Sequence, residues 1–153
     1  MDFILTAIGR VRGGRTEPTD DDWGASRAIV ELDPGQFGDD ALTGLETFSH
    51  VEIVYLFDQV AASDVVSGAR HPRGRTDWPE IGIFAQRGRT RPNRLGVTVC
   101  KVVSATGRSL EVEGLDAIDG TPVLDIKPFM TGFAPRGAVT EPDWAREIMA
   151  DYW

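Results

Sequence analysis

The sequence predicts a mainly β protein, a barrel or a sandwich of about seven short strands with one C-terminal helix. Apolar and β-branched runs recur along the chain between turn residues, and strands do not alternate with helices. The 153 residues are enough for one ordinary domain and too few for two full ones. We therefore expect a single domain over residues 1–153.

The N-terminal third predicts two strands and one short helical segment. Residues 3–11 mix apolar and β-branched side chains and end before a pair of glycines. Residues 28–32 form a second strand, which stops at a turn because Pro34 fixes φ and Gly35 accepts a positive φ. Residues 38–45 are compatible with one or two helical turns.

The remaining strands are expected between residues 51 and 127. Residues 51–57 are the most apolar stretch, so this strand is expected to be buried on both faces. Further strands are predicted at residues 81–85, 96–103, 110–112 and 121–127, the middle two joined across a turn at 106–108. Residues 142–152 predict a helix that begins at a proline. The connection 61–79, roughly 20 residues long, has no strong pattern, and loops of that length are usually functional or mobile.

The composition excludes several classes of protein. A net charge of −8 and a pI near 4.7 argue against a protein whose whole surface binds nucleic acid. The single cysteine, Cys100, excludes an intrachain disulfide and a zinc site built from several cysteines, and no metal site is expected. No apolar run reaches the length of a membrane span, and the N-terminus has no secretory signal pattern. We expect a cytoplasmic protein that is a monomer or a small oligomer.

The arginines are unevenly distributed. Seven of the 14 lie between residues 70 and 94, where only Asp77 and Glu80 oppose them. The planar guanidinium group suits the recognition of carboxylates and phosphates. The alternative is a solvated loop whose arginines pair with the surplus acids of the chain. The sequence leaves both interpretations open.

Two segments are more specific than ordinary barrel strands. Residues 82–97 run from an apolar strand into an Arg-Pro-Asn turn at 91–93, whose proline and asparagine hold the flanking guanidinium groups in a fixed geometry. Residues 114–129 place three aspartates around a Gly-Thr-Pro turn at 120–122. An aspartate-stabilised turn with one salt bridge is the alternative explanation of this second segment.

Together these segments resemble the TsaA-like family, also called TrmO or YaeB-like, of S-adenosylmethionine-dependent tRNA methyltransferases, and the chain resembles a short single-domain member. The resemblance covers about residues 8–129, and family members typically have a histidine where this chain has Asp58. The matching blocks, in the family's order, are Ile8-Gly9-x-Val11-Arg12, Gly44-Leu45-Glu46-x-Phe48-Ser49-His50, Phe57-x-Gln59, His71-Pro72-Arg73, Gly82-Ile83-Phe84-Ala85-x-Arg87, Arg91-Pro92-Asn93-x-x-Gly96 and Leu115-Asp116-x-x-Asp119-Gly120-Thr121-Pro122-Val123-x-Asp125-Ile126-Lys127-Pro128.

The resemblance implies a closed β-barrel, a homodimer and a pocket for S-adenosylmethionine without a Rossmann element, which agrees with the missing G-x-G-x-x-G motif. Arg87 would hold the methionine carboxylate, an aspartate of the 115–120 turn the ribose hydroxyls, and Asp58 would lie near the sulfonium cation. The cofactor-binding residues that it implies are Trp23, Gly24, Asp58, Gln59, Arg87, Val97, Leu115, Asp116, Ala117, Ile118, Asp119 and Gly120. The catalytic residues are Asp58, Arg91 and Asn93, and the substrate-binding residues are Arg73, Arg75, Arg91 and Lys127.

Three functions are compatible with this resemblance. The first is methylation of the exocyclic amino nitrogen of threonylcarbamoyl-adenosine beside the tRNA anticodon, with the arginine-rich stretch on the RNA phosphates. The second is methylation of a small acidic or aromatic metabolite. The third is a non-catalytic module that binds S-adenosylmethionine.

Overall fold

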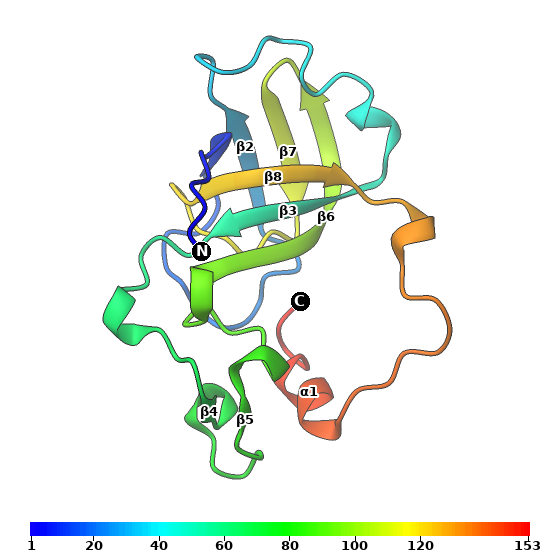
Figure 1. Cartoon of the computed structure of the whole chain (residues 1–153). Coiled ribbons are helices and arrows are strands. Elements are labelled where there is room, and N and C mark those ends of the chain that lie inside the picture. The colour runs from blue at the N-terminus through cyan, green and yellow to red at the C-terminus, as the bar shows by residue number, and fades with distance from the viewer.

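The computed structural model describes residues 1–153 and contains a closed antiparallel barrel (Figure 1). This barrel confirms the mainly β fold class expected from the sequence. Its six strands follow the order β1 (Gly9–Arg12), β2 (Arg27–Leu32), β7 (Ser109–Glu113), β6 (Leu95–Thr106), β3 (His50–Leu56) and β8 (Pro122–Pro128). A separate two-stranded sheet pairs β4 (Ala69–Arg70) with β5 (Ile81–Gly82). That residues 1–153 form one domain stays a prediction.

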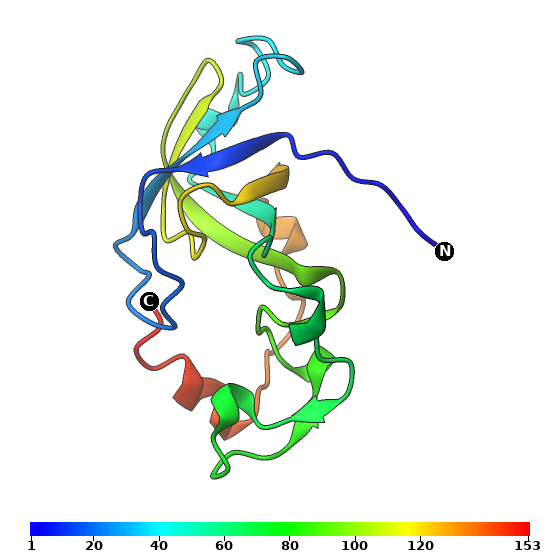
Figure 2. The ribbon, with the colours of Figure 1, turned by 90° about the vertical axis from the view of Figure 1, so that its left-hand side faces the viewer.

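One α-helix and six short 3₁₀ helices complete the chain. The α-helix is α1 (Asp143–Ile148), and the 3₁₀ helices are Leu45–Thr47, Ala62–Asp64, Pro72–Gly74, Ile83–Ala85, Pro92–Arg94 and Thr131–Phe133. None of the helices is long and apolar enough to cross a membrane. In Figures 1 and 2, β4, β5 and α1 lie together below the barrel.

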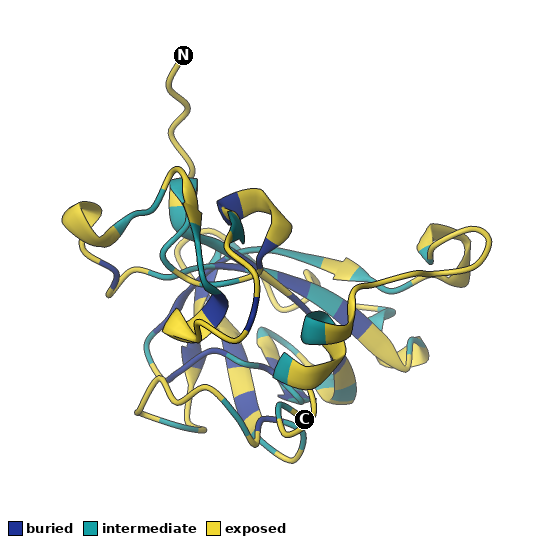
Figure 3. Ribbon diagram, turned by 90° about the horizontal axis from the view of Figure 1, so that it is seen from below, coloured by how far each residue is buried: buried dark blue, intermediate teal, exposed yellow.

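Alternating side chains fill the barrel. Strand β2 alternates exposed and buried residues along its whole length, so that Ala28, Val30 and Leu32 face inward. Inward residues of the other strands, with Leu115 of the turn between β7 and β8, join them in one apolar cluster. The strand residues of this cluster include Val11, Val51, Ile53, Tyr55, Cys100, Leu110, Val112 and Val123. Figure 3 shows buried stretches along the strands of the ribbon and mostly exposed loops around them.

Strand β3 corrects one expectation, because it is not buried on both faces. Val51, Ile53 and Tyr55 are fully buried, but Glu52 and Val54 on the other face are only half-buried. An antiparallel barrel solvates the outer face of its strands, and no second layer covers β3 here. β3 pairs with β6 over seven residues and with β8 on its other side.

The barrel closes between β1 and β8 through only two residue pairs, Gly9 with Val123 and Arg10 with Pro122. The predicted first strand, residues 3–11, was too long at its start. Phe3 and Ile4 are exposed, and Figure 2 shows the N-terminal arm running away from the barrel with no strand beside it. Backbone groups in such an arm have no ladder partner, so regular strand begins only at Gly9.

Several other boundaries differ from the sequence expectation, three of them through a change of local structure. The strand expected at 81–85 ends at Gly82 and continues as a 3₁₀ turn. The helical turns expected at 38–45 begin late, as a 3₁₀ helix at Leu45–Thr47. The helix expected at 142–152 ends at Ile148, because the residues beyond it turn back toward the barrel and bond to another segment.

Candidate functional site

A carboxylate, Asp116, lies at one end of the barrel, in the turn between β7 and β8. The Tyr55 hydroxyl donates to its Oδ1 over 2.8 Å, and the Thr98 hydroxyl donates to the same oxygen. Tyr55 points inward from β3 and Thr98 inward from β6, so two barrel strands fix the position of this carboxylate. Both hydroxyl groups belong to buried residues.

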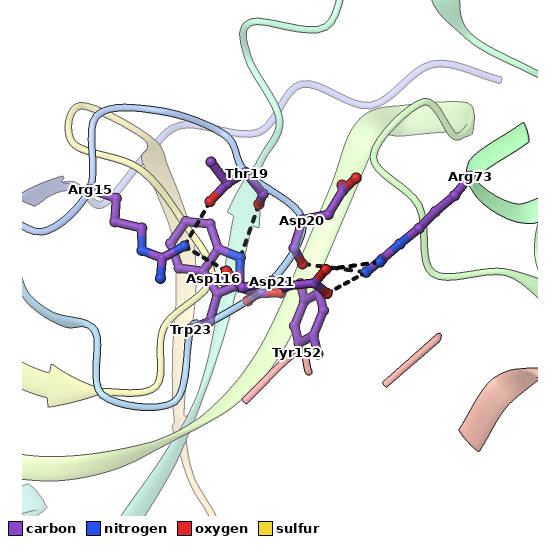
Figure 4. Close-up of polar contacts among 8 residues, drawn as sticks. All are labelled: Arg15, Thr19, Asp20, Asp21, Trp23, Arg73, Asp116 and Tyr152. Carbon is purple, nitrogen blue, oxygen red and sulfur yellow. Dashed lines mark hydrogen bonds and ion pairs between the residues drawn. The ribbon is translucent and has the colours of Figure 1, made fainter. Parts of the chain in front are cut away.

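The other oxygen of Asp116 accepts a hydrogen bond from Tyr152, a residue beyond α1 (Figure 4). The backbone of this C-terminal segment pairs with the 19–24 loop. The Trp23 amide donates to the Tyr152 carbonyl over 2.7 Å, and the Asp22 amide donates to the Asp151 carbonyl over 2.9 Å. Trp23 itself is buried and donates through its indole Nε1 to the Thr19 carbonyl.

Burial and the negative charge of Asp116 favour the neutral form of the groups around it. Burial raises the pKa of both Tyr55 and Tyr152 far above the ordinary value, and the Asp116 carboxylate raises it further. Burial, and then Asp116, raises the pKa of the Cys100 thiol to about 12. The two tyrosines therefore stay protonated and act as donors to the carboxylate, and Cys100 is an inert thiol.

The turn that carries Asp116 has free backbone donors. The amides of residues 115–118 donate no hydrogen bond within the chain, although Leu115, Ala117 and Ile118 are buried. Buried amides are normally paired, so four free amides in succession, three of them in buried residues, form a set of donors available to a ligand.

The far end of this turn is anchored. Asp119 accepts a hydrogen bond from the Gly13 amide over 2.8 Å, and the Gly120 amide donates to the Val11 carbonyl over 2.8 Å. One oxygen of Asp119 therefore holds the turn against β1, which leaves Asp116 as the aspartate of the turn that faces the tyrosines.

Arg87 and Val97 lie together at the same barrel end. Arg87 donates through Nη2 to the Val97 carbonyl over 2.7 Å, and its exposed guanidinium group has no carboxylate within ion-pair distance. Its positive charge also acts on Tyr152, where it opposes the rise in the pKa of that phenol. The remaining donors of Arg87 are available for an anionic group.

Asp58 and Gln59 follow β3 and lie beside the Arg-Pro-Asn turn, because the Phe57 amide donates to the Arg94 carbonyl over 2.8 Å. The side chains of Asp58, Gln59 and Asn93 are exposed and make no hydrogen bond within the chain. Asn93 has a φ of 62°, which confirms the tight turn expected there. The structure places these residues at the ends of β3 and β6 but not in contact with Asp116.

Arg91 is held by the fold. It donates to the Gln86 carbonyl over 2.8 Å, and its half-buried side chain braces the chain just before the Arg-Pro-Asn turn. This contact gives Arg91 a structural task beside the catalytic and substrate-binding roles expected from the sequence.

Three predicted substrate-binding residues already pair with acids. Arg73 forms two bonds to Asp21, of 2.8 and 3.1 Å. Arg75 pairs with Asp77 and stacks over the Trp78 ring, and Lys127 pairs with Asp125 on β8. These pairs match the alternative in which the bases offset nearby acids. The arginines of this stretch without a carboxylate partner are Arg70, Arg87, Arg89, Arg91 and Arg94.

Sequence reasoning missed Tyr55, Thr98 and Tyr152. A signal existed for Thr98, because it is a polar residue on the inward face of β6, between Gly96 and Cys100. A buried polar residue needs a partner, and this one points to the turn. No local pattern connects Tyr152 to Asp116, because that contact depends on the path of the whole C-terminal segment.

The fold and this site define a β-barrel protein with a cluster of polar groups and free backbone donors at one barrel end. The model of the tRNA-methyltransferase O N-terminal domain matches residues 17–134, and the chain belongs to this family. A mouse tRNA (adenine(37)-N6)-methyltransferase is 36% identical over 110 residues, which are 71% of this chain and 25% of the relative. A probable S-adenosyl-L-methionine-binding protein of Archaeoglobus fulgidus is 38% identical over 104 residues, 68% of this chain and 27% of that protein.

This chain thus spans about a quarter of the length of these two curated relatives. Among solved structures, a crystal structure of TrmO from Pseudomonas aeruginosa superimposes with a TM-score of 0.75 at 30% identity. The match covers 94% of this chain and 62% of that chain. The family likeness therefore includes the three-dimensional arrangement of the barrel.

Proposed function

We propose that this chain binds S-adenosylmethionine at the Asp116 turn and transfers its methyl group to the N6 nitrogen of an adenine in tRNA. The observation that carries the proposal is the run of four unpaired amides at residues 115–118, in the turn that carries the Asp116 carboxylate. Adenine offers acceptor nitrogens to amide donors, and a ribose offers hydroxyls to a carboxylate. The name of the mouse relative supports this reaction, and the name of the archaeal relative supports this cofactor.

The residues of the chain suit the parts of this cofactor. Arg87 has free donors for the methionine carboxylate, and Asp116 is an acceptor for ribose hydroxyls. The buried side chains of Leu115 and Ile118 offer apolar contact to the adenine ring. Asp58, which is exposed beside the Arg-Pro-Asn turn, would place negative charge near the sulfonium.

When bound, S-adenosylmethionine supplies a methyl carbon on a positively charged sulfur, which leaves as a neutral thioether when the amino nitrogen attacks in line. The task of the protein is then to align the two reactants and exclude water, without a covalent intermediate. Asp58 is the carboxylate of the chain proposed to accept the proton that the nitrogen loses, and Arg91 and Asn93 are proposed to orient the base. Trp23 and Gly24 would border the same pocket.

For the acceptor, we propose threonylcarbamoyl-adenosine beside the tRNA anticodon. Its carboxylate and the neighbouring phosphates suit the arginines that have no acidic partner, such as Arg89 and Arg94. The test is incubation of the purified protein with S-adenosylmethionine and tRNA from a strain that lacks this gene, followed by mass spectrometry of the nucleosides. One added methyl group on the modified adenosine supports the proposal, and an unchanged nucleoside profile overturns it.

A second candidate is methylation of a small acidic metabolite. The ion pairs of Arg73 and Arg75, together with the net charge of −8, reduce the positive surface available to RNA and favour this candidate. Turnover of S-adenosylmethionine without any affinity for tRNA would identify it. Binding without turnover would instead identify a non-catalytic module.

We also propose that the protein is a cytoplasmic homodimer. Phe3, Ile4 and Leu5 are exposed, as is more than half of the Trp153 surface, and aromatic and apolar groups are enriched at protein interfaces. Light scattering should give about twice the chain mass at tens of micromolar protein. A monomer mass under those conditions would contradict the dimer.

A further inference from the structure

The C-terminal segment reaches the Asp116 site through a tether, residues 135–140, that makes no hydrogen bonds. All the residues of the tether are exposed. Beyond them the chain folds into α1 and returns to the barrel, as Figures 1 and 2 show. The segment that follows is therefore fixed by its docking contacts and not by the chain that leads to it.

The docked part, residues 143–153, is named here the latch. Two backbone hydrogen bonds join it to the Asp22 and Trp23 amides, and Tyr152 bonds to Asp116. Nearer its start, Glu147 accepts a hydrogen bond of 2.6 Å from the Trp78 indole. These hydrogen bonds are few, and three of the residues that make them, Asp22, Glu147 and Asp151, are exposed, so undocking costs less than unfolding of the barrel.

The latch lies on positions that the proposed function gives to the cofactor. The Trp23 amide donates to the backbone of the latch. Gly24 lies against the end of the latch, since a Cβ atom built at Gly24 would stand 2.6 Å from the Trp153 carbonyl carbon. Asp116 bonds to its tyrosine (Figure 4). The positive charges of Arg73 and Arg87 lower the pKa of Tyr152 and so oppose the rise caused by burial and by Asp116.

We propose that the latch is autoinhibitory: the Tyr152 hydroxyl occupies the ligand-facing oxygen of Asp116, and S-adenosylmethionine binds only when residues 143–153 undock. The inference rests on the proposed function, because it takes the Asp116 turn as the cofactor site.

The hydrogen bonds of Asp116 explain why docking and binding exclude each other. Its Oδ1 already accepts from Tyr55 and Thr98, whose strands hold it in place. The other oxygen, Oδ2, accepts from the Tyr152 hydroxyl. A ribose hydroxyl that approached the same oxygen would meet the phenol ring, so the ligand must displace the tyrosine.

Calorimetric titration with S-adenosylmethionine tests the latch. Tyr152→Phe removes the bond to Asp116, and we expect it to bind roughly tenfold more tightly than the wild type, because a larger fraction of the protein is competent. Glu147→Gln weakens the latch away from the site and is expected to tighten binding by roughly two- to fivefold. Arg136→Gln, in the tether, is the matched control and should leave the affinity unchanged.

Hydrogen exchange supplies a readout that does not depend on the cofactor. The Asp22 and Trp23 amides should lose protection in ligand-free Tyr152→Phe, and also in the wild type when S-adenosylmethionine is added. Equal or weaker binding by Tyr152→Phe overturns the latch and leaves the proposed function intact. Failure of the wild type and both latch variants to bind overturns the proposed function and the latch together.

Discussion

The Tyr55 hydroxyl and the Asp116 carboxylate, 61 positions apart in sequence, are joined by a hydrogen bond of 2.8 Å. Tyr55 belongs to the central strand β3 and is almost fully buried, so the bond ties the turn before β8 to the barrel core. The geometry of the candidate site is therefore set by core packing, and changes in the core are expected to reach it.

Gly96→Ala tests this dependence. A Cβ at position 96 would stand 2.4 Å from Tyr55 ring carbons, so the ring must move and take its bond to Asp116 with it. We expect a loss of about 1–3 kcal/mol in the free energy of unfolding, measured in urea, together with weaker cofactor binding. Gly82→Ala is the control: nothing lies within 4 Å of its Cβ position, and its effect should stay within about 0.5 kcal/mol. Equal effects of the two variants would contradict the argument.

Arg87→Ala is expected to weaken S-adenosylmethionine binding by about tenfold or more, because a charge-assisted bond to a carboxylate contributes about 1.5–3 kcal/mol. Isothermal titration calorimetry measures the change. Arg108→Ala is a matched control, since Arg108 pairs with Asp39 at the opposite end of β7. If Arg87→Ala bound S-adenosylmethionine with the affinity of the wild type, Arg87 would not be a cofactor-binding residue.

The salt dependence of tRNA binding separates the paired arginines from the unpaired ones. Arg89→Ala should reduce the slope of log affinity against log salt by about 0.7–0.9, the value of one phosphate contact. The double change Arg73→Ala with Arg75→Ala should leave the slope almost unchanged, because Asp21 and Asp77 already neutralise these groups. A flattening by about one to two units in the double variant would mean that the ion pairs open to bind phosphates.

Stability should fall in alkali. The folded pKa of Cys100, about 12, lies above the ordinary value of 9.0, so the folded state retains a proton that the unfolded chain loses. Folding stability therefore decreases as the pH rises above about 9, and the decrease stops only near pH 12. Urea unfolding of Cys100→Ala between pH 9 and 10 should show a flatter decrease than the wild type; the raised pKa of Tyr55 and Tyr152 adds a decrease that both proteins share. Parallel curves would exclude Cys100 as the cause.

The sequence pattern was sufficient for the mainly β class, because alternation and turn residues are local signals, but it left a barrel and a sandwich open, and the closed barrel came from the family resemblance. The pair β6 and β7 was predictable from apolar strands on both sides of a turn with Gly107, which has a φ of 59°. The expectation that β3 is buried on both faces was wrong, because the apolar Val54 has the sequence character of a buried residue although it lies on the half-exposed face.

The candidate site was only partly predictable. The family motif pointed to residues 115–120, and the unpaired amides there fit a ligand site. The three hydroxyls on Asp116 come from residues far from it in sequence, and no spacing rule brings them together. Pairing of Arg73 with Asp21 was likewise open, because charge counts do not say which groups meet.

The pairing of β1 with β8 through two residue pairs, called here the seam, has a consequence for the order of folding. It joins residues near the start of the chain to Pro122 and Val123, so a very long loop must close before the few contacts of the seam are gained. The hairpin of β6 and β7 needs only a short loop and can form early. Barrel closure is therefore expected as a late, slow event, after a folding transition state formed by β3, β6 and β7. Mutations in the β1–β8 pairing should then change the unfolding rate and leave the folding rate almost unchanged, which corresponds to folding φ-values near zero.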